Sequence, residues 1–171
     1  MALEQQIRGK RKRYTGYRSF QYLEPGADYT EFKLAKEINR VSSRVVEVSP
    51  EQAARAQRLL EESLVISLHD HAFVVPEDPQ QIFEYRRAGR DWTGYEGLSV
   101  SGIDAIFDCL MDGTACITSK AGWKWDDVIW DLGMRLSDIA HQDMLIRAET
   151  TDDIVKARQD GQIAFIPSLE A

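Results

Sequence analysis

Short apolar runs alternate with longer stretches of helical periodicity along this chain. Runs rich in apolar and β-branched residues predict strands at residues 64–71, 103–110 and 144–147, and in the terminal run of residues 163–171. Apolar residues that recur every three or four positions predict helices at residues 50–64, 79–88, 125–141 and 151–160. Strands that alternate with helices in this way indicate an α/β fold with parallel strands.

Several helix starts carry capping residues. The predicted N-caps are Ser49, Asp78 and Thr150. A proline follows the first two, which suits the first helical position, and the first and third are followed three residues later by Gln and Asp. Residues 91–97 and 113–122 contain glycines and no helical period, so we expect loops there.

The chain divides into two parts. Residues 1–48 show no clear period but are rich in aromatic residues, which predicts an irregular arm that packs on the rest of the protein. The aromatic residues of this arm are Tyr14, Tyr17, Phe20, Tyr22, Tyr29 and Phe32. Residues 49–171 carry the alternating strands and helices.

Composition limits the class of protein. The chain has 171 residues, 43% of them hydrophobic and 29% charged, as expected of a globular protein. Its net charge of -7 argues against nucleic-acid binding, which needs a basic surface. No apolar run is long enough to predict a membrane helix. The two cysteines, Cys109 and Cys116, indicate no disulfide framework, so we expect a cytoplasmic protein.

The first strand ends in the most informative motif, His69-Asp70-His71. Side chains two apart on a strand point to the same side, so both imidazoles are expected to face one site. Neutral imidazoles bind zinc and similar metals. A hydrogen-bonded pair of histidines without a metal is the alternative. His141, near the end of a helix, is expected to interact with the helix dipole and not with a metal.

Four motifs, taken in order, resemble the renal (membrane) dipeptidase family of the amidohydrolase superfamily. They are HDH at 69–71, SGIDA at 101–105, TDDIVKARQDGQIA at 151–164 and SLEA at 168–171. The resemblance begins near residue 65, and the first 64 residues contribute nothing to it. The family typically has His-x-Asp at the first motif, whereas this chain has His-x-His, as the wider superfamily does.

The resemblance implies the N-terminal part of a (β/α)8 TIM-barrel hydrolase. It implies a metallodipeptidase that cleaves a dipeptide or related small amide with a water activated by two zinc ions. His69 and His71 would bind one ion and Glu170 would bridge both. The family's catalytic aspartate and later histidine ligands have no counterpart in these residues, so no catalytic residue is assigned.

A barrel of this type takes about 250 residues, and this chain supplies roughly half of the strands. We therefore expect the 171 residues alone to be inactive and to bind metal weakly. An incomplete sheet exposes strand edges, so we expect poor stability, or pairing with another chain, including a second copy in a homo-oligomer. The competing hypothesis is a non-catalytic truncated or degenerate relative that acts as an interaction module.

Overall fold

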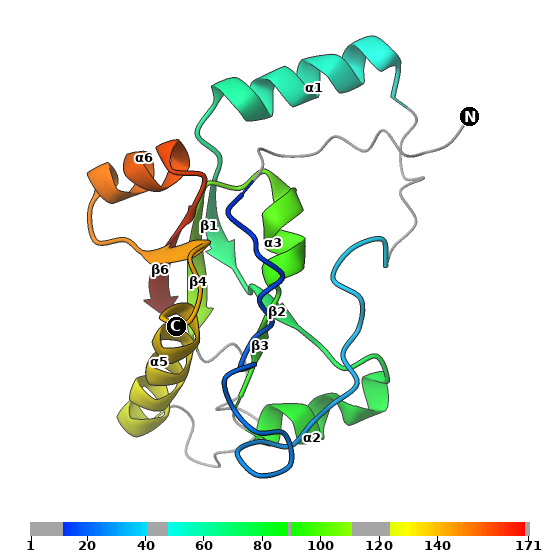
Figure 1. The fold of residues 1–171 in the computed structure, drawn as a ribbon, viewed down its shortest axis with the longest axis vertical. Coiled ribbons are helices and arrows are strands. Elements are labelled where there is room, and N and C mark those ends of the chain that lie inside the picture. The colour runs from blue at the N-terminus through cyan, green and yellow to red at the C-terminus, as the bar shows by residue number, and fades with distance from the viewer. Residues whose placement is uncertain (1–11, 41–47, 89, 111–123, 170–171) are drawn as a thin grey trace.

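A parallel four-stranded sheet forms the centre of the molecule (Figure 1). The computed structural model describes residues 12–40, 48–88, 90–110 and 124–169. The strands of the sheet are β1 (Ile66–Asp70), β4 (Ala105–Leu110), β5 (Leu145–Arg147) and β6 (Ile163–Leu169). The predicted α/β class and the parallel pairing of the strands are confirmed.

The strand order is β1-β4-β6-β5, which differs from the order along the chain. Strand β4 pairs along its whole length with β6, from Ala105 opposite Ala164 to Leu110 opposite Leu169. Strand β5 pairs only with the first three residues of β6 and occupies the edge of the sheet. In a barrel whose strands follow chain order, β5 would lie between β4 and β6. The described residues thus form an open sheet, and a barrel is not shown.

Helices pack on both faces of this sheet. Successive residues of a strand point to opposite faces. Ile163 and Phe165 of β6 join a core cluster with Ile139 of helix α5 (Trp125–Ile139). Ala164, between them, packs instead in a cluster with Ile154 of helix α6 (Thr151–Gln159). The two helices therefore cover opposite faces.

The capping boxes predicted for two helices are present. They begin helix α1 (Pro50–Glu62) and helix α6. In α6, the Thr150 hydroxyl accepts a hydrogen bond from the amide of Asp153 at 3.3 Å, and the Asp153 carboxylate accepts one from the amide of Thr150 at 2.9 Å. The third predicted N-cap, Asp78, begins the short helix η1 (Pro79–Gln81), which continues into α2 (Ile82–Arg87).

Thr150→Ala is expected to lower the free energy of unfolding by about 1 kcal/mol, because the change removes one side of a capping box. Chemical denaturation of the two proteins measures the difference. Thr150→Ser keeps the hydroxyl and should cost much less. Equal losses in both variants would mean that the hydroxyl is not what stabilises this helix.

Residues 91–97 were predicted to be a loop, and this was wrong in part. They contain strand β3 (Trp92–Thr93) and the start of helix α3 (Tyr95–Ser101). Strand β3 pairs antiparallel with β2 (Phe73–Val74). Trp92 and Tyr95 are buried, so tertiary packing fixes a segment whose glycines locally favour a turn.

The described part of the arm packs against the rest of the chain through aromatic and polar contacts. Phe20 lies in a buried cluster with Tyr85 of α2 and Trp92 of β3. In Figure 1 this part of the arm runs as a blue trace past β3 toward α2. At its start, the Lys12 ammonium and the Asp104 carboxylate form an ion pair of 2.8 Å, with both side chains fully buried.

Helix α1 stands at the periphery of the molecule and none of its residues is buried (Figure 1). Leu59 on this helix and Leu68 on the edge strand β1 are 51% and 76% exposed. Large apolar side chains are thus open to solvent beside an unpaired edge of the described sheet. Among the helices of the described residues, none combines the length and the apolar character needed to cross a membrane.

Candidate metal centre

His69 and His71 converge at the C-terminal end of β1. The Nε2 atoms of the two imidazoles lie 3.1 Å apart. His69 is exposed and His71, one residue beyond the strand, is half-buried. The prediction that both side chains face one site is therefore supported by the geometry.

A bulge in β1 lies at this point. Ser67 is opposite Ile106 and Asp70 is opposite Asp108, so β1 has one more residue than β4 in this interval. A bulge of this kind redirects side chains and is common next to functional sites. The simple alternation assumed from the sequence does not hold through the bulge, although the two histidines still meet.

The spacing of the two imidazoles matches a metal site. Two nitrogens bound to zinc at about 2.0–2.1 Å in a tetrahedral arrangement lie about 3.3 Å apart. The observed 3.1 Å between Nε2 atoms is close to that value. The same distance also fits a hydrogen bond between the two imidazoles, which is the metal-free alternative expected from the sequence.

Cys109 of β4 is the third candidate ligand. Its Sγ lies 3.7 Å from Nδ1 of His69, and one ligand atom from each of the three residues lies within 4.8 Å of the other two. Cys109 is buried and stands opposite Ser168 of β6, whose Oγ lies 3.4 Å from Sγ. Three adjacent parallel strands thus bring polar groups to one end of the sheet, where α/β folds usually bind ligands.

Sequence reasoning did not assign Cys109 to the site. It placed Cys109 in a predicted strand and concluded from the two cysteines only that they indicate no disulfide framework. One signal was available, because Cys109 lies near the C-terminal end of the strand predicted at residues 103–110, and in an α/β fold that end is expected beside the end of the histidine strand. The register between β1 and β4, which brings them together, is a long-range property.

A buried carboxylate fixes the chain just after His71. Asp108 accepts a hydrogen bond from the amide of Ala72 at 2.9 Å and forms an ion pair with Arg135 of α5. Burial raises the pKa of Asp108, while the charge of Arg135 and the Ala72 amide oppose that shift. Asp108 is therefore committed to the backbone and to Arg135, and it holds His71 in place.

Glu170, Cys116 and His141 are not among the residues that the structure groups with His69 and His71. Glu170 and Cys116 lie outside the described residues. His141 lies just beyond α5, far from the cluster in the fold, where its Nδ1 is 2.7 Å from the carbonyl of Ser137 and its ring stacks on Tyr22. The predicted structural role of His141 is in keeping with these contacts.

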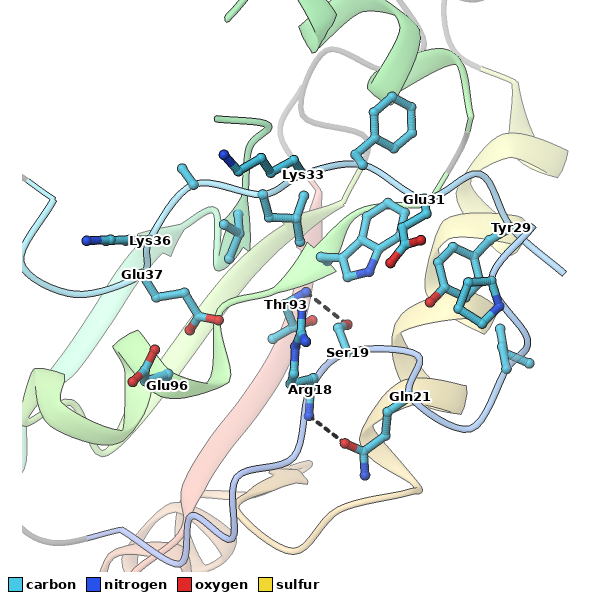
Figure 2. A pocket seen from close by; sticks show the side chains of 17 residues that line it. Arg18, Ser19, Gln21, Tyr29, Glu31, Lys33, Lys36, Glu37, Thr93 and Glu96 are labelled. Carbon is cyan, nitrogen blue, oxygen red and sulfur yellow. Dashed lines mark hydrogen bonds between the residues drawn. The ribbon is translucent and has the colours of Figure 1, made fainter. Parts of the chain in front are cut away.

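A polar cleft of about 910 Å³ lies between the arm and the β2–β3–α3 region (Figure 2). Figure 2 shows the carboxylates of Glu37 and Glu96 on one side of it, close to each other. Burial raises the pKa of Glu37, while the amide of Gly97, which donates to Glu37 at 2.8 Å, opposes that shift. A smaller hollow of about 270 Å³ shares Glu37 in its lining and reaches His71.

Comparisons of this chain with protein-family models, with curated proteins and with solved structures give no match. The relation to the renal dipeptidase family therefore stands as a prediction from the sequence motifs.

Proposed function

We propose that this chain carries the metal-binding end of a metal-dependent hydrolase that cleaves a dipeptide or a related small amide. The observation that carries the proposal is the 3.1 Å separation of the Nε2 atoms of His69 and His71. This separation is close to the roughly 3.3 Å expected between two imidazole nitrogens bound to one tetrahedral zinc ion. The pair also lies at the C-terminal end of a parallel strand, where the resemblance to the dipeptidase family expects it.

The rest of the proposal concerns the metal and its chemistry. His69 and His71 would hold one ion, and Glu170 would join them as the resemblance implies. A zinc ion bound there supplies a water acidic enough to act as a nucleophile near neutral pH. The hollow that reaches His71 gives a small substrate room beside the site.

We further propose that β1, β4 and β6 are three neighbouring strands of a barrel. Their pairing is parallel and their order agrees with chain order once β5 is set aside. Strand β5 pairs with β6 only as far as Phe165, so the residues from 166 to 169 keep an open edge within the described sheet. A following barrel strand would pair there.

Metal binding is tested by titrating the protein with zinc in a calorimeter. His69→Ala and His71→Ala each remove a metal ligand. We expect each to weaken zinc binding by more than about tenfold, because even the loss of a residue that only hydrogen-bonds to a ligand reduces metal affinity by about that factor. His141→Ala is the matched control and should bind as the unaltered protein does. Equal affinity in all four proteins would contradict the assignment.

Catalysis is tested separately, by hydrolysis of simple dipeptides with the gene product that contains these residues. Turnover that requires zinc and is lost in His69→Ala supports the hydrolase. Zinc binding with no turnover overturns the hydrolase and favours the non-catalytic interaction module. Turnover that survives His69→Ala overturns the assignment of His69 to the catalytic metal.

A further inference from the structure

We infer that the Cys109 thiolate is the third protein ligand of the metal, which makes the site a His2Cys centre. This inference rests on the metal site of the proposed function but not on its hydrolytic activity. Neither the sequence motifs nor the resemblance to a carboxylate-bridged family assigns this residue to a metal.

Proximity is the first argument. Candidate ligand atoms of His69, His71 and Cys109 all lie within 4.8 Å of one another. A sulfur and a nitrogen bound to one tetrahedral zinc ion lie about 3.5 Å apart. Sγ is 3.7 Å from Nδ1 of His69, whereas Nε2 of the same ring faces His71. An imidazole binds an ion through one nitrogen, so the exposed ring of His69 must turn for one ion to be shared with His71 and Cys109. Cys109 lies on β4, a central strand of the described sheet.

Charge is the second argument. Two neutral imidazoles leave the double charge of a zinc ion uncompensated, so an anionic ligand is favoured. The nearest carboxylate on β4, Asp108, is engaged with Arg135 and with the amide of Ala72. Asp70 also ends β1, but it does not belong to the group of His69, His71 and Cys109 whose ligand atoms lie within 4.8 Å of one another. Within that group, the thiol of Cys109 is the one that can become an anion.

The surroundings of the sulfur provide the third argument. The hydroxyl of Ser168 lies 3.4 Å from Sγ, held there by the register of β4 with β6. Toward a thiolate this hydroxyl donates its hydrogen. Hydrogen bonds of this kind from outside the ligand set orient a ligand and tune the metal. A thiolate also selects zinc or cobalt over magnesium, calcium and manganese.

The test uses cobalt as a spectroscopic substitute for zinc. A cobalt–thiolate bond gives a sulfur-to-metal charge-transfer band in the near ultraviolet, which imidazole and carboxylate ligands do not. We expect this band in the unaltered protein and in Cys116→Ser, which removes the other cysteine. We expect its loss in Cys109→Ser, with metal affinity reduced by more than about tenfold.

A second measurement avoids any dependence on the folding of Cys109→Ser. In the Cys116→Ser protein, Cys109 is the single thiol, and zinc should slow its alkylation while magnesium should not. Ser168→Ala should keep the cobalt band but shift it, because the hydrogen bond to sulfur is lost.

Two outcomes overturn the inference. One is cobalt binding that requires His69 and His71 but shows no thiolate band. The other is alkylation of Cys109 at the same rate with and without zinc. Either result leaves the proposed hydrolase standing with Glu170 as the third ligand, and Glu170→Gln would then reduce affinity. A thiolate band without dipeptide hydrolysis would instead remove the proposed function and keep the His2Cys centre.

Discussion

Replacing Arg135 with methionine is expected to lower the free energy of unfolding by about 3–5 kcal/mol, because the change leaves buried carboxylates without their counter-charge. The guanidinium of Arg135 is 5% exposed and forms an ion pair with Asp108, whose side chain is fully buried. Its Nε also lies 3.1 Å from Asp131, and a third carboxylate, Asp91, lies 3.8 Å from its NH2 group. A loss of this size is a large part of the 5–15 kcal/mol that stabilises a typical domain.

The directions of the pKa shifts of Arg135 and Asp108 agree with a loss of stability in Arg135→Met. Burial by itself would lower the pKa of Arg135, but the charge of Asp108, followed by those of Asp131 and Asp91, raises it. The guanidinium is therefore charged at every pH at which the protein folds. Without it, burial leaves Asp108 with its pKa raised further, and the carboxyl must take up a proton or remain as an uncompensated charge.

A double-mutant cycle tests this interpretation. Arg135→Met, Asp108→Asn and the double variant are unfolded with urea while circular dichroism follows the helices. The double variant is expected to lose less than the sum of the two single losses, by about 1–3 kcal/mol, since it leaves fewer unpaired charges. Simple additivity would show that the two residues stabilise the protein independently.

The same cluster connects stability to the candidate metal centre. Asp108 binds the amide of Ala72, the residue after His71. In Asp108→Asn, the side chain keeps an oxygen that can accept this bond, whereas Asp108→Ala has none. Zinc affinity in the folded protein should therefore fall more in the alanine variant than in the asparagine variant.

Local features of the fold were predictable from the sequence. The caps at Ser49 and Thr150 depend on residues at most three apart, and both are present. The helix predicted at residues 125–141 corresponds to Trp125–Ile139, because its apolar positions recur through four turns. His69 and His71 converge as expected, although the register shift in β1 means that simple strand alternation does not account for it.

Features that depend on long-range pairing were not predictable. The sequence does not specify that β5 joins the outer edge of β6, because a three-residue strand has little pattern of its own. Nor does it specify that Cys109 lies beside His69, forty positions away. Trp92 was assigned to a loop, although burial in an aromatic cluster places it in a strand. In each case tertiary contacts decide between alternatives that local preference leaves open.

Asp138→Ala is the second change with a large expected effect, because Asp138 attaches the arm to the body of the protein. Its fully buried carboxylate accepts hydrogen bonds from the hydroxyl of Tyr17 at 2.7 Å, that of Ser19 at 2.5 Å and the amide of Phe20 at 2.8 Å. The hydroxyl of Tyr95, in α3, donates a fourth at 2.9 Å. The Asp138 side chain of α5 thus accepts hydrogen bonds from three residues of the arm and from one residue of α3.

The hydroxyls of Tyr17 and Tyr95 can donate to Asp138 over a wide pH range. Burial raises the pKa of Tyr17 and Tyr95, and their hydrogen bonds to Asp138 raise both pKa values further. Both phenols therefore stay protonated and keep donating well above neutral pH.

Removing the carboxylate leaves three buried donors without this acceptor, while the hydroxyl of Tyr17 keeps the backbone carbonyl of residue 138 at 3.4 Å. Each unsatisfied buried group costs about 1–3 kcal/mol. Relaxation of the arm and entry of water offset part of that cost. We therefore expect Asp138→Ala to lose about 3 kcal/mol or more of unfolding free energy. The loss should be accompanied by faster hydrogen exchange in residues 12–40, since these residues lose their attachment to α5.

Two controls separate detachment of the arm from general destabilisation. Tyr22→Phe removes an exposed hydrogen bond to Ser137 near the same helix end and should cost less than about 1 kcal/mol. Arg135→Met destabilises the same helix but leaves the carboxylate of Asp138 intact, so the arm should exchange no faster than the sheet does. If Asp138→Ala accelerates exchange equally in the arm and in β4, the carboxylate stabilises the whole core and not the arm in particular.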